Sequence, residues 1–423
     1  MNVPLVCDYG SGFSKVGFSG MEAPRAVFPT ILGKLRHDNL LVGMEEEDWF
    51  IGDEAQKRRR ELNLQCPVSR ATVTNWDNME KIWHHSFYQV LCIAPEQHPL
   101  MVTEPPSNPM SSKEKMSQIW HHSFYQVLCI AQRPHLAENR SLISQLHGGS
   151  ALPTTPATSS LTFLSAGLPC ILSETFNVPA LHLANQGVLS LYASGQTSGT
   201  TIESGEGMTY FVPIIDGCPL HQSTIQMDIA GQDLTLYLLQ LLTDSGHSLV
   251  SRGDWEYIRD IKEKCCYVAS DFKKEKMKAS SPSYARKFQL PDGQEITLGP
   301  EKFLCPEGLF QADLMGRNSL GIHMKAFRSV SSCSPALWKI LFGHMVLSGG
   351  TGCCPGLRFR LQREIAALVS PTINVKVSSC PSSIHSAWLG GSILCSLSTF
   401  KDMWVTSKEY KDIGASIVRR RTF

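Results

Sequence analysis

Two glycine-rich segments, far apart in the chain, carry the residues best suited to binding a phosphate. The first is residues 8–15 (DYGSGFSK) and the second is residues 203–207 (ESGEG), each following an apolar, strand-like run. Glycine lets the backbone approach phosphate oxygens, and exposed N–H groups then bind the anion. The acidic residue that opens each segment can hold Mg²⁺ through its water shell. One such loop is equally typical of an ordinary turn, but the pair, with residues 348–352 (SGGTG) as a third loop, predicts two half-domains that clamp one Mg–nucleotide.

The composition narrows the class of protein. The chain has 423 residues, a net charge of +1, 42% hydrophobic and 18% charged residues, which is typical of a globular protein of two or three domains. Near-zero charge gives no support for nucleic-acid binding or a polybasic membrane anchor. No apolar run reaches the about 18 residues of a membrane span, and the N-terminus lacks the pattern of a signal peptide. The 14 cysteines include no zinc-type C-x-x-C pair, so we expect reduced thiols in a cytosolic or nuclear protein.

Several longer segments resemble actin, and the resemblance covers nearly the whole chain outside one insertion. The likeness is clearest in residues 23–29 (APRAVFP), 73–85 (VTNWDNMEKIWHH), 189–195 (LSLYASG), 290–294 (LPDGQ) and 388–394 (WLGGSIL). The resemblance implies an α/β protein with the actin fold, which hexokinase and the heat-shock ATPases share. In that fold two α/β halves surround a nucleotide cleft, and each half carries a smaller appended subdomain. The departures described below indicate a divergent, actin-related protein.

The resemblance also implies how the chain is divided. Subdomain 1, the first half-domain, would be assembled from residues 1–29, 70–119, 172–193 and 386–423. Residues 30–69 would form a small subdomain with a subunit-contact loop, and residues 194–385 the second half-domain (subdomains 3 and 4). Residues 120–171 have no family counterpart. We expect this insertion to be largely disordered, because its later part is low in complexity and cannot bury enough apolar surface.

The insertion contains a duplication. Residues 82–94 (IWHHSFYQVLCIA) recur unchanged at residues 119–131. A structural repeat usually drifts in sequence and recurs at least three times, so we interpret this pair as a recent duplication or an error in the gene model. We expect the first copy to occupy the native helix. The second copy would either extend the broken helix or compete with the first for the same site.

Carried over position by position, the resemblance assigns the first glycine loop to the β- and γ-phosphates. The residues expected to hold them are Gly10, Ser11, Gly12, Phe13 and Lys15. Asp8 matches the aspartate on the Mg²⁺ side of the family's site. Gln186 matches the glutamine that orients the attacking water, and a satisfied core amide is the alternative for it.

The second loop departs from the family pattern. Glu203 and Glu206 stand where actins have aspartates, one on the water shell of the metal and one near the ribose, and Tyr210 replaces a histidine of the same water network. One added methylene moves a carboxylate by roughly 1.5 Å, and errors of that size can cost about 100-fold in a positioned reaction. A tyrosine hydroxyl, with a pKa of about 10, is a poor general base. We therefore expect nucleotide binding to be kept and hydrolysis to be weak or absent.

The remaining nucleotide contacts that the resemblance implies come from the second half. They are Gly205, Gly207, Gly231, Lys262, Glu263, Gly349, Gly350 and Thr351. Ile384 and Cys354 replace a lysine and a tyrosine that pack near the base in actins, which should weaken retention of the base. The expected cofactor is ATP or ADP with Mg²⁺, with Ca²⁺ as the alternative metal.

Two implied surfaces bear on assembly. Residues 36–44 resemble the loop with which actins contact a neighbouring subunit, but an acidic run that actins lack, residues 45–48, follows it. If this acidic run meets like charges on a neighbouring subunit, it would oppose association. The alternative is that the run is simply solvated and has no role in assembly. The cleft that takes amphipathic helices of actin-binding proteins is kept, though part of it could be core: Tyr192, Ala193, Gly195, Gly217, Leu394, Leu397, Thr399 and Met403.

The sequence thus predicts an actin-like cytoskeletal or scaffold protein that binds a nucleotide, polymerises in an altered way and is at most a weak ATPase. Its expected partners are actin or similar subunits and proteins with an amphipathic helix. Poor myosin binding is expected because the acidic N-terminal cluster of actins is missing. We expect a cytoplasmic, cytoskeletal location, with the nucleus as an alternative, and neither nucleic-acid binding nor membrane insertion. The competing interpretations are a polymerisation-coupled ATPase and a decayed duplicate without function.

Overall fold

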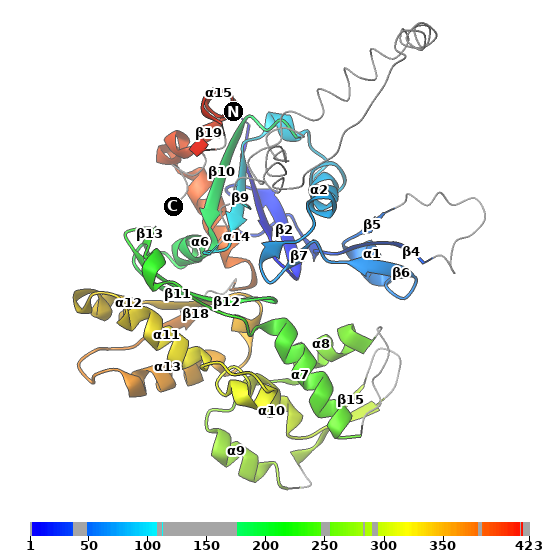
Figure 1. Cartoon of the computed structure of the whole chain (residues 1–423), viewed down its shortest axis with the longest axis vertical. Coiled ribbons are helices and arrows are strands. Elements are labelled where there is room, and N and C mark those ends of the chain that lie inside the picture. The colour runs from blue at the N-terminus through cyan, green and yellow to red at the C-terminus, as the bar shows by residue number, and fades with distance from the viewer. Residues whose placement is uncertain are drawn as a thin grey trace, which may run out of the picture.

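The computed structural model describes residues 2–36, 49–107, 112, 176–246, 254–281, 284–289, 295–379, 383–414 and 416–417. In Figure 1 two α/β bodies lie one above the other, each built around a twisted sheet. The predicted subunit-contact loop, from residue 37 onward, lies outside the described residues. So do the second copy of the repeat and the whole of the predicted insertion, residues 120–171.

The first sheet has the strand order β19-β10-β9-β1-β2-β3. Its strands are β1 (Leu5–Tyr9), β2 (Phe13–Phe18), β3 (Ala26–Pro29), β9 (Leu100–Glu104), β10 (Ala180–Asn185) and β19 (Val405–Thr406). Every residue of β9 and β10 is buried, as expected for parallel strands covered on both faces. The helices around this sheet are α2 (Trp76–His84), α6 (Gln186–Ala193), α14 (Ser386–Ser396) and α15 (Ser407–Ile413).

The second sheet has the order β13-β12-β11-β17-β18, with β14 paired to β12. Its strands are β11 (Gly199–Ser204), β12 (Thr209–Ile215), β13 (Cys218–Pro219), β14 (Ile225–Met227), β17 (Met345–Ser348) and β18 (Val377–Ser379). The surrounding helices are α7 (Gly231–Asp244), α8 (Asp254–Cys265), α10 (Glu301–Glu307), α11 (Ile322–Ser331), α12 (Trp338–Gly343) and α13 (Leu357–Leu368). Their buried faces, with the strands, form the largest apolar core of the described residues.

The two sheets share one construction, and it positions the glycine loops. In the first, β1 and β2 form an antiparallel hairpin and β9 lies parallel to β1. In the second, β11 and β12 form the hairpin and β17 lies parallel to β11. Each predicted phosphate loop is the turn of one hairpin. Since the carboxyl ends of parallel strands meet at one sheet edge, the ends of β9 and β17 lie beside these turns, where ligands of open α/β sheets usually bind.

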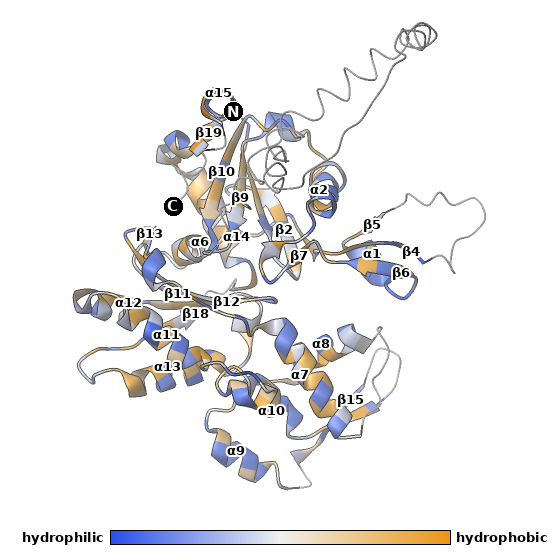
Figure 2. Ribbon diagram, in the orientation of Figure 1, coloured by the Kyte–Doolittle hydropathy of each residue, from blue (hydrophilic) through white to orange (hydrophobic). Residues whose placement is uncertain are grey.

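Each body carries a smaller appendage. The first has β4 (Leu32–Leu35), β5 (Phe50–Ile51), β6 (Leu62–Gln65) and α1 (Asp53–Lys57), followed by the short hairpin β7 (Val68–Ser69) and β8 (Thr72–Val73). The second has α9 (Phe272–Lys278), β15 (Arg286–Gln289) and β16 (Glu295–Leu298). In Figure 2 α9 is mostly hydrophilic, and none of its residues is buried. The appendages therefore contribute less to the cores than the central sheets do.

The first copy of the repeated segment begins in helix α2 and continues through a π-helical turn, His85–Val90. Asn75 caps α2, because its side chain accepts a hydrogen bond from the amide of Asn78. Ile82, Trp83 and Phe87 of this copy are fully buried in the first core.

Helices α6 and α14 pack tightly against each other and join the two bodies. Helix α6 leads from β10 of the first sheet toward β11 of the second, and α14 returns the chain from β18 to the first body. A β-carbon at Gly390 of α14 would overlap the carbonyl oxygen of Leu189 in α6. The indole N–H of Trp388 donates to the carbonyl of Val6 in β1 at 2.8 Å. The distance between the two bodies is thus set by helix backbones in contact, without an intervening side chain.

We predict that Gly390→Ala destabilises the protein by about 3 kcal/mol, because a methyl group placed against a backbone carbonyl forces the packed helices apart. Gly343→Ala is the matched control, since a β-carbon there would have only one neighbour, an oxygen at 3.8 Å. Equilibrium unfolding in urea measures both free energies. Equal midpoints for the two variants would contradict the proposed backbone contact.

Candidate functional site

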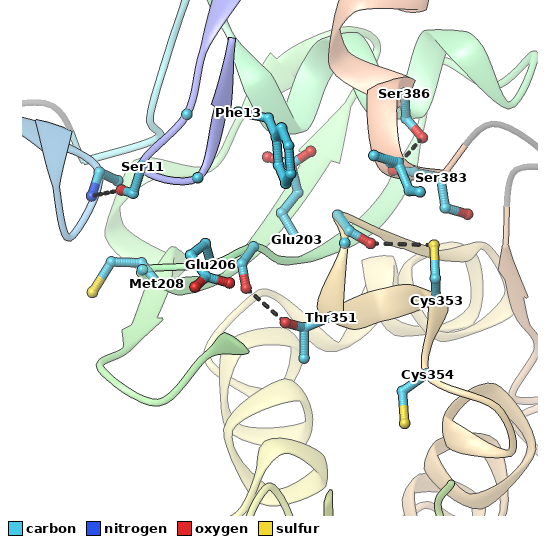
Figure 3. Close-up of a pocket in the computed structure, with 18 of the residues that line it drawn as sticks. Ser11, Phe13, Glu203, Glu206, Met208, Thr351, Cys353, Cys354, Ser383 and Ser386 are labelled. Carbon is cyan, nitrogen blue, oxygen red and sulfur yellow. Dashed lines mark hydrogen bonds between the residues drawn. The ribbon is translucent and has the colours of Figure 1, made fainter. Parts of the chain in front are cut away.

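A cavity of about 570 Å³ lies between the two bodies, where both hairpin turns and the start of α14 converge. Its volume is in the range of pockets that bind small molecules and cofactors. Figure 3 shows Ser11 and Phe13 of the first body on one side and Glu206, Met208 and Thr351 of the second body on the other. The predicted nucleotide-site residues that line it are Asp8, Gly10, Ser11, Gly12, Phe13, Lys15, Gln186, Glu203, Gly205, Glu206, Gly207, Tyr210, Lys262, Glu263, Gly349, Gly350 and Thr351.

The two glycine loops are tight turns that approach each other closely. The amide of Gly10 donates to the carbonyl of Phe13 at 3.0 Å, and that of Gly205 to the carbonyl of Met208 at 3.1 Å. Within the part of the chain that the structure describes, the amides of residues 11–12 and 206–207 have no acceptor. A β-carbon at Gly12 would lie 3.1 Å from the Glu206 β-carbon. Free backbone donors from both bodies therefore meet, which is the arrangement that binds an anion.

Asp8, at the end of β1, is the most densely bonded carboxylate of the cavity. Its Oδ2 accepts from Lys15 Nζ at 2.8 Å, and its Oδ1 accepts from Thr103 Oγ1 at 2.6 Å and from Gln186 Nε2 at 3.0 Å. Burial opposes the charge of Asp8, but Lys15 and these hydrogen bonds outweigh it and lower the pKa of the carboxyl. Asp8 is therefore an anion near neutral pH and holds both Lys15 and Gln186 at the phosphate side of the cavity.

Glu203, at the end of β11, faces Asp8 from the second body. Its Oε1 accepts from the hydroxyl of Ser190 in α6 and from that of Ser348 in β17, the latter at 3.1 Å. Burial, together with the charge of Asp8, raises the pKa of Glu203 to about 7. Tyr210 lies opposite Glu203 on β12, and burial and the Glu203 charge raise its pKa to about 12. Tyr210 is therefore protonated at neutral pH, whereas Glu203 takes up and releases its proton in that range.

The start of helix α7 closes the far side of the second loop. The Gly231 amide donates to the Gly205 carbonyl at 3.0 Å, and the Thr351 hydroxyl donates to the same oxygen at 2.7 Å. Lys262 Nζ donates to the Gly231 carbonyl at 2.8 Å. Gly231 itself does not line the cavity, because Glu206 covers it and leaves no room for a β-carbon. This end of the cavity is lined by Glu263 and by a set of apolar and thiol side chains: Leu234, Cys266, Cys305, Pro306, Cys353, Cys354 and Ile384.

Comparison with known proteins decides the family. The sequence model of the Actin family matches residues 2–140 and 169–423. The chain is 38% identical to centractin of Schizosaccharomyces pombe, over 99% of this chain and 98% of centractin. The chain belongs to the actin family. The predicted actin fold and the predicted divergence are thereby confirmed, and this is an actin-like cytoskeletal protein.

The stretch that the actin model leaves unmatched, residues 141–168, lies inside the predicted insertion, whose bounds of 120–171 remain a prediction. Among the described residues, no helix has the length and apolar character needed to cross a bilayer.

Several residues of the actin-like site were not expected from the sequence. They are Thr103 on Asp8, and Ser190 and Ser348 on Glu203. Thr103 could have been suspected from its place at the end of a buried strand, because such strand ends form the ligand edge of an α/β sheet. Ser190 and Ser348 sit within apolar segments and give no such signal.

A groove of about 200 Å³ lies between α6, the end of α14 and the segment that follows, in the region where the sequence predicts a partner cleft. Four of the eight predicted cleft residues line it, namely Tyr192, Leu394, Thr399 and Met403. Ala193, Gly195, Gly217 and Leu397 lie outside its lining; a β-carbon at Gly217 would overlap the Tyr192 hydroxyl, and Leu397 is exposed.

His182 forms part of the groove wall and was not predicted. Its Nδ1 donates to the Met403 carbonyl at 3.1 Å, and its ring meets Phe400 edge-on at 4.9 Å. Its Nε2 has no hydrogen-bond partner among the described residues. Burial lowers the pKa of His182 to about 4, so the ring is neutral in the folded protein.

We predict that His182→Phe removes part of the acid sensitivity of folding. In the unfolded chain the histidine takes up a proton near its ordinary pKa of 6.5, whereas in the folded chain it does so only near 4. The contribution of His182 to the free energy of unfolding is therefore complete above pH 6.5, and it falls by about 3 kcal/mol as the pH drops to 4. Urea unfolding at pH 7, 5.5 and 4.5 measures the slope. The exposed residue His84, changed to Phe, is the control and should keep the wild-type slope; an unaltered slope in His182→Phe refutes the assignment.

Proposed function

We propose that this chain is an actin-like cytoskeletal or scaffold subunit that binds Mg–ATP or Mg–ADP between its two bodies, with weak or absent hydrolysis and altered polymerisation. The observation that carries the proposal is the meeting of free amides from residues 11–12 and 206–207 beside Lys15. These groups supply backbone donors and one cation at a single place, which suits a chain of phosphates better than an uncharged ligand.

The residues present fit a metal-bound nucleotide. Among the described residues, no group of three or more His, Cys, Asp or Glu side chains could hold a metal ion unaided. Mg²⁺ is commonly held by one or two carboxylates together with substrate phosphates, and Asp8 and Glu203 face each other across the phosphate side. When bound, the ion would neutralise charge on the phosphates. The base would lie toward Lys262, Glu263 and Ile384, at the thiol-lined end.

Weak hydrolysis follows from the groups around Gln186. Its amide donates to Asp8 and, at 3.3 Å, to Thr103, and these bonds hold the side chain at the phosphate side. Tyr210 keeps its proton at neutral pH because its pKa is raised to about 12, and Glu203, although its pKa is raised to about 7, has its Oε1 engaged by two hydroxyls. A general base works best with a pKa near the working pH and an open path to its proton.

The alternative is a polymerisation-coupled ATPase of the conventional actin kind. The placement of Gln186 favours it, since this residue lines the cavity and its amide lies 3.0 Å from Asp8. A decayed duplicate is the remaining interpretation, and it predicts a chain that holds no ligand.

Location and partners follow from the family alone. We propose a place in the cytoplasmic cytoskeleton, with the nucleus as the alternative, and assembly with actin or similar subunits. The groove beside Tyr192 and Met403 would take an amphipathic helix of a binding protein. We further propose poor myosin binding, no nucleic-acid binding and no insertion into a membrane.

The proposed function predicts that the protein carries a bound nucleotide. Protein purified without added nucleotide should release close to one ATP or ADP per chain when it is denatured with acid and the supernatant is quantified by chromatography. Gly12→Val should lose this nucleotide while keeping its fold, because a side chain there would meet Glu206. A folded wild-type protein that releases no nucleotide refutes the proposed function.

A measurement of phosphate release distinguishes the scaffold interpretation from the ATPase interpretation. Phosphate release from Mg–ATP by wild-type protein should stay within about twofold of that by Gln186→Ala, because little hydrolysis is left to lose. Gln222→Ala, an exposed position away from the cavity, is the control. A fall of about 100-fold in Gln186→Ala, which is the size expected on loss of a group that positions a proton transfer, would establish the ATPase instead.

A further inference from the structure

Arg70 reaches from the first body into the second beside the two glycine loops. It lies in the turn between β7 and β8, yet its Nη1 donates to the carbonyl of Gly207 at 3.1 Å and to the Asp233 carboxylate at 3.0 Å. Its Nη2 donates to the other oxygen of Asp233 at 2.8 Å. The carbonyl of Asp228 accepts a further bond from Nη1. One guanidinium therefore holds the second glycine loop and the first turn of α7 together.

The next residue contacts the first glycine loop. The amide of Ala71 donates to the hydroxyl oxygen of Ser11 at 3.0 Å. A β-carbon at Gly207 would lie 2.8 Å from that same Ser11 oxygen and 3.0 Å from the Arg70 α-carbon. The Arg70–Ala71 turn is thus in contact with both loops at the point where they approach each other.

This turn has an unfavourable backbone conformation. Arg70 has a φ of 47° and Ala71 a φ of 59°, and two consecutive non-glycine residues in the left-handed region are rare. Such strain persists only where the surroundings hold the chain in place. The bidentate pair with Asp233, whose side chain is only 3% exposed, supplies that restraint.

The bond from Ala71 also directs the Ser11 hydroxyl. A hydroxyl has one proton to donate and two lone pairs. Since one lone pair receives the Ala71 N–H, the proton of Ser11 points away from this turn, and Ser11 lines the cavity. Ser11 is then set to donate to an anion that lies between the loops.

We propose that Arg70 is a positioning residue for phosphate binding: by pairing with Asp233 it fixes the spacing of the two glycine loops and aims the Ser11 hydroxyl at the phosphates. The identity of the ligand rests on the proposed function, but the restraint on the loops does not.

The chain provides a matched control for this role. Arg317 also pairs with Asp233, through its Nη2 at 3.1 Å, but it belongs to the second body and does not contact the first loop. Removing either arginine takes one cation from the same carboxylate. Only the loss of Arg70 should release the restraint between the bodies.

The first test needs no nucleotide. Hydrogen exchange of the Ala71 amide is measured in nucleotide-free wild-type protein, Arg70→Met and Arg317→Met. Loss of charge-assisted bonds in Arg70→Met should speed exchange on the order of tenfold or more, whereas Arg317→Met should stay within about threefold of wild type. Equal exchange in the two variants would mean that Arg70 only neutralises Asp233, and the proposal would fail. If Arg70→Met does not fold, Arg70→Lys is used, because lysine keeps the charge but lacks the planar fork that holds both oxygens.

The second test uses etheno-ATP with Mg²⁺ and measures its release rate. We expect Arg70→Met and Ser11→Ala each to speed the release of etheno-ATP about tenfold, and Arg317→Met to change it less than about threefold. The double variant Arg70→Met/Ser11→Ala should release the nucleotide no faster than either of its single variants. If the effects of the two substitutions on the release rate multiply in the double variant, Arg70 does not act through Ser11. If wild-type protein binds no nucleotide, the proposed function fails, and the exchange of the Ala71 amide still decides the role of Arg70.

Discussion

The structure depends on how closely two backbone turns approach each other. An anion can be shared between the bodies only if amides from both turns reach it, and amides are short donors fixed to the main chain. A β-carbon at Gly12 would meet Glu206, and one at Gly207 would meet the Ser11 hydroxyl. The glycines are therefore required by the distance between the turns as well as by the turns themselves. Helices α6 and α14 set that distance, since their backbones touch at Gly390.

The charges of the cavity explain why a metal would be needed. Asp8 and Glu203 line the phosphate side, and each phosphate group adds further negative charge. Of the two lysines that line the cavity, Lys15 is paired with Asp8 and Lys262 is bonded to the start of α7. Backbone amides carry only partial charges. A polyphosphate without a divalent cation would therefore meet a net repulsive site, whereas with the cation Asp8 would be a partner of the ligand and Lys15 would be free to turn toward it.

Much of this arrangement could be predicted from the sequence because it is local. The two hairpin turns, the glycines in them and the acidic residue before each lie within a few positions of one another, and the cavity is lined by them as expected. What the sequence concealed is long-range. Ser348 bonds Glu203 from 145 positions away and Arg70 bonds Asp233 from 163. Nothing in a serine inside an apolar strand, or in an arginine after a short hairpin strand, indicates which distant carboxylate it will meet.

The same limit affects the argument about Glu203. From the sequence, a glutamate in place of an aspartate reaches about one methylene further, and the expected fault is a carboxylate out of place. In the structure one oxygen of Glu203 accepts from Ser190 of α6 and from Ser348 of β17, so the side chain is held from both bodies. Burial and the charge of Asp8 also raise the pKa of Glu203 to about 7, so without a bound cation this carboxyl is partly protonated at neutral pH. Length alone therefore does not describe this substitution. The two serines and the facing aspartate therefore bear on this substitution as much as its length does, and a site that only binds a ligand tolerates such a change more readily than a site that must also position a water for attack.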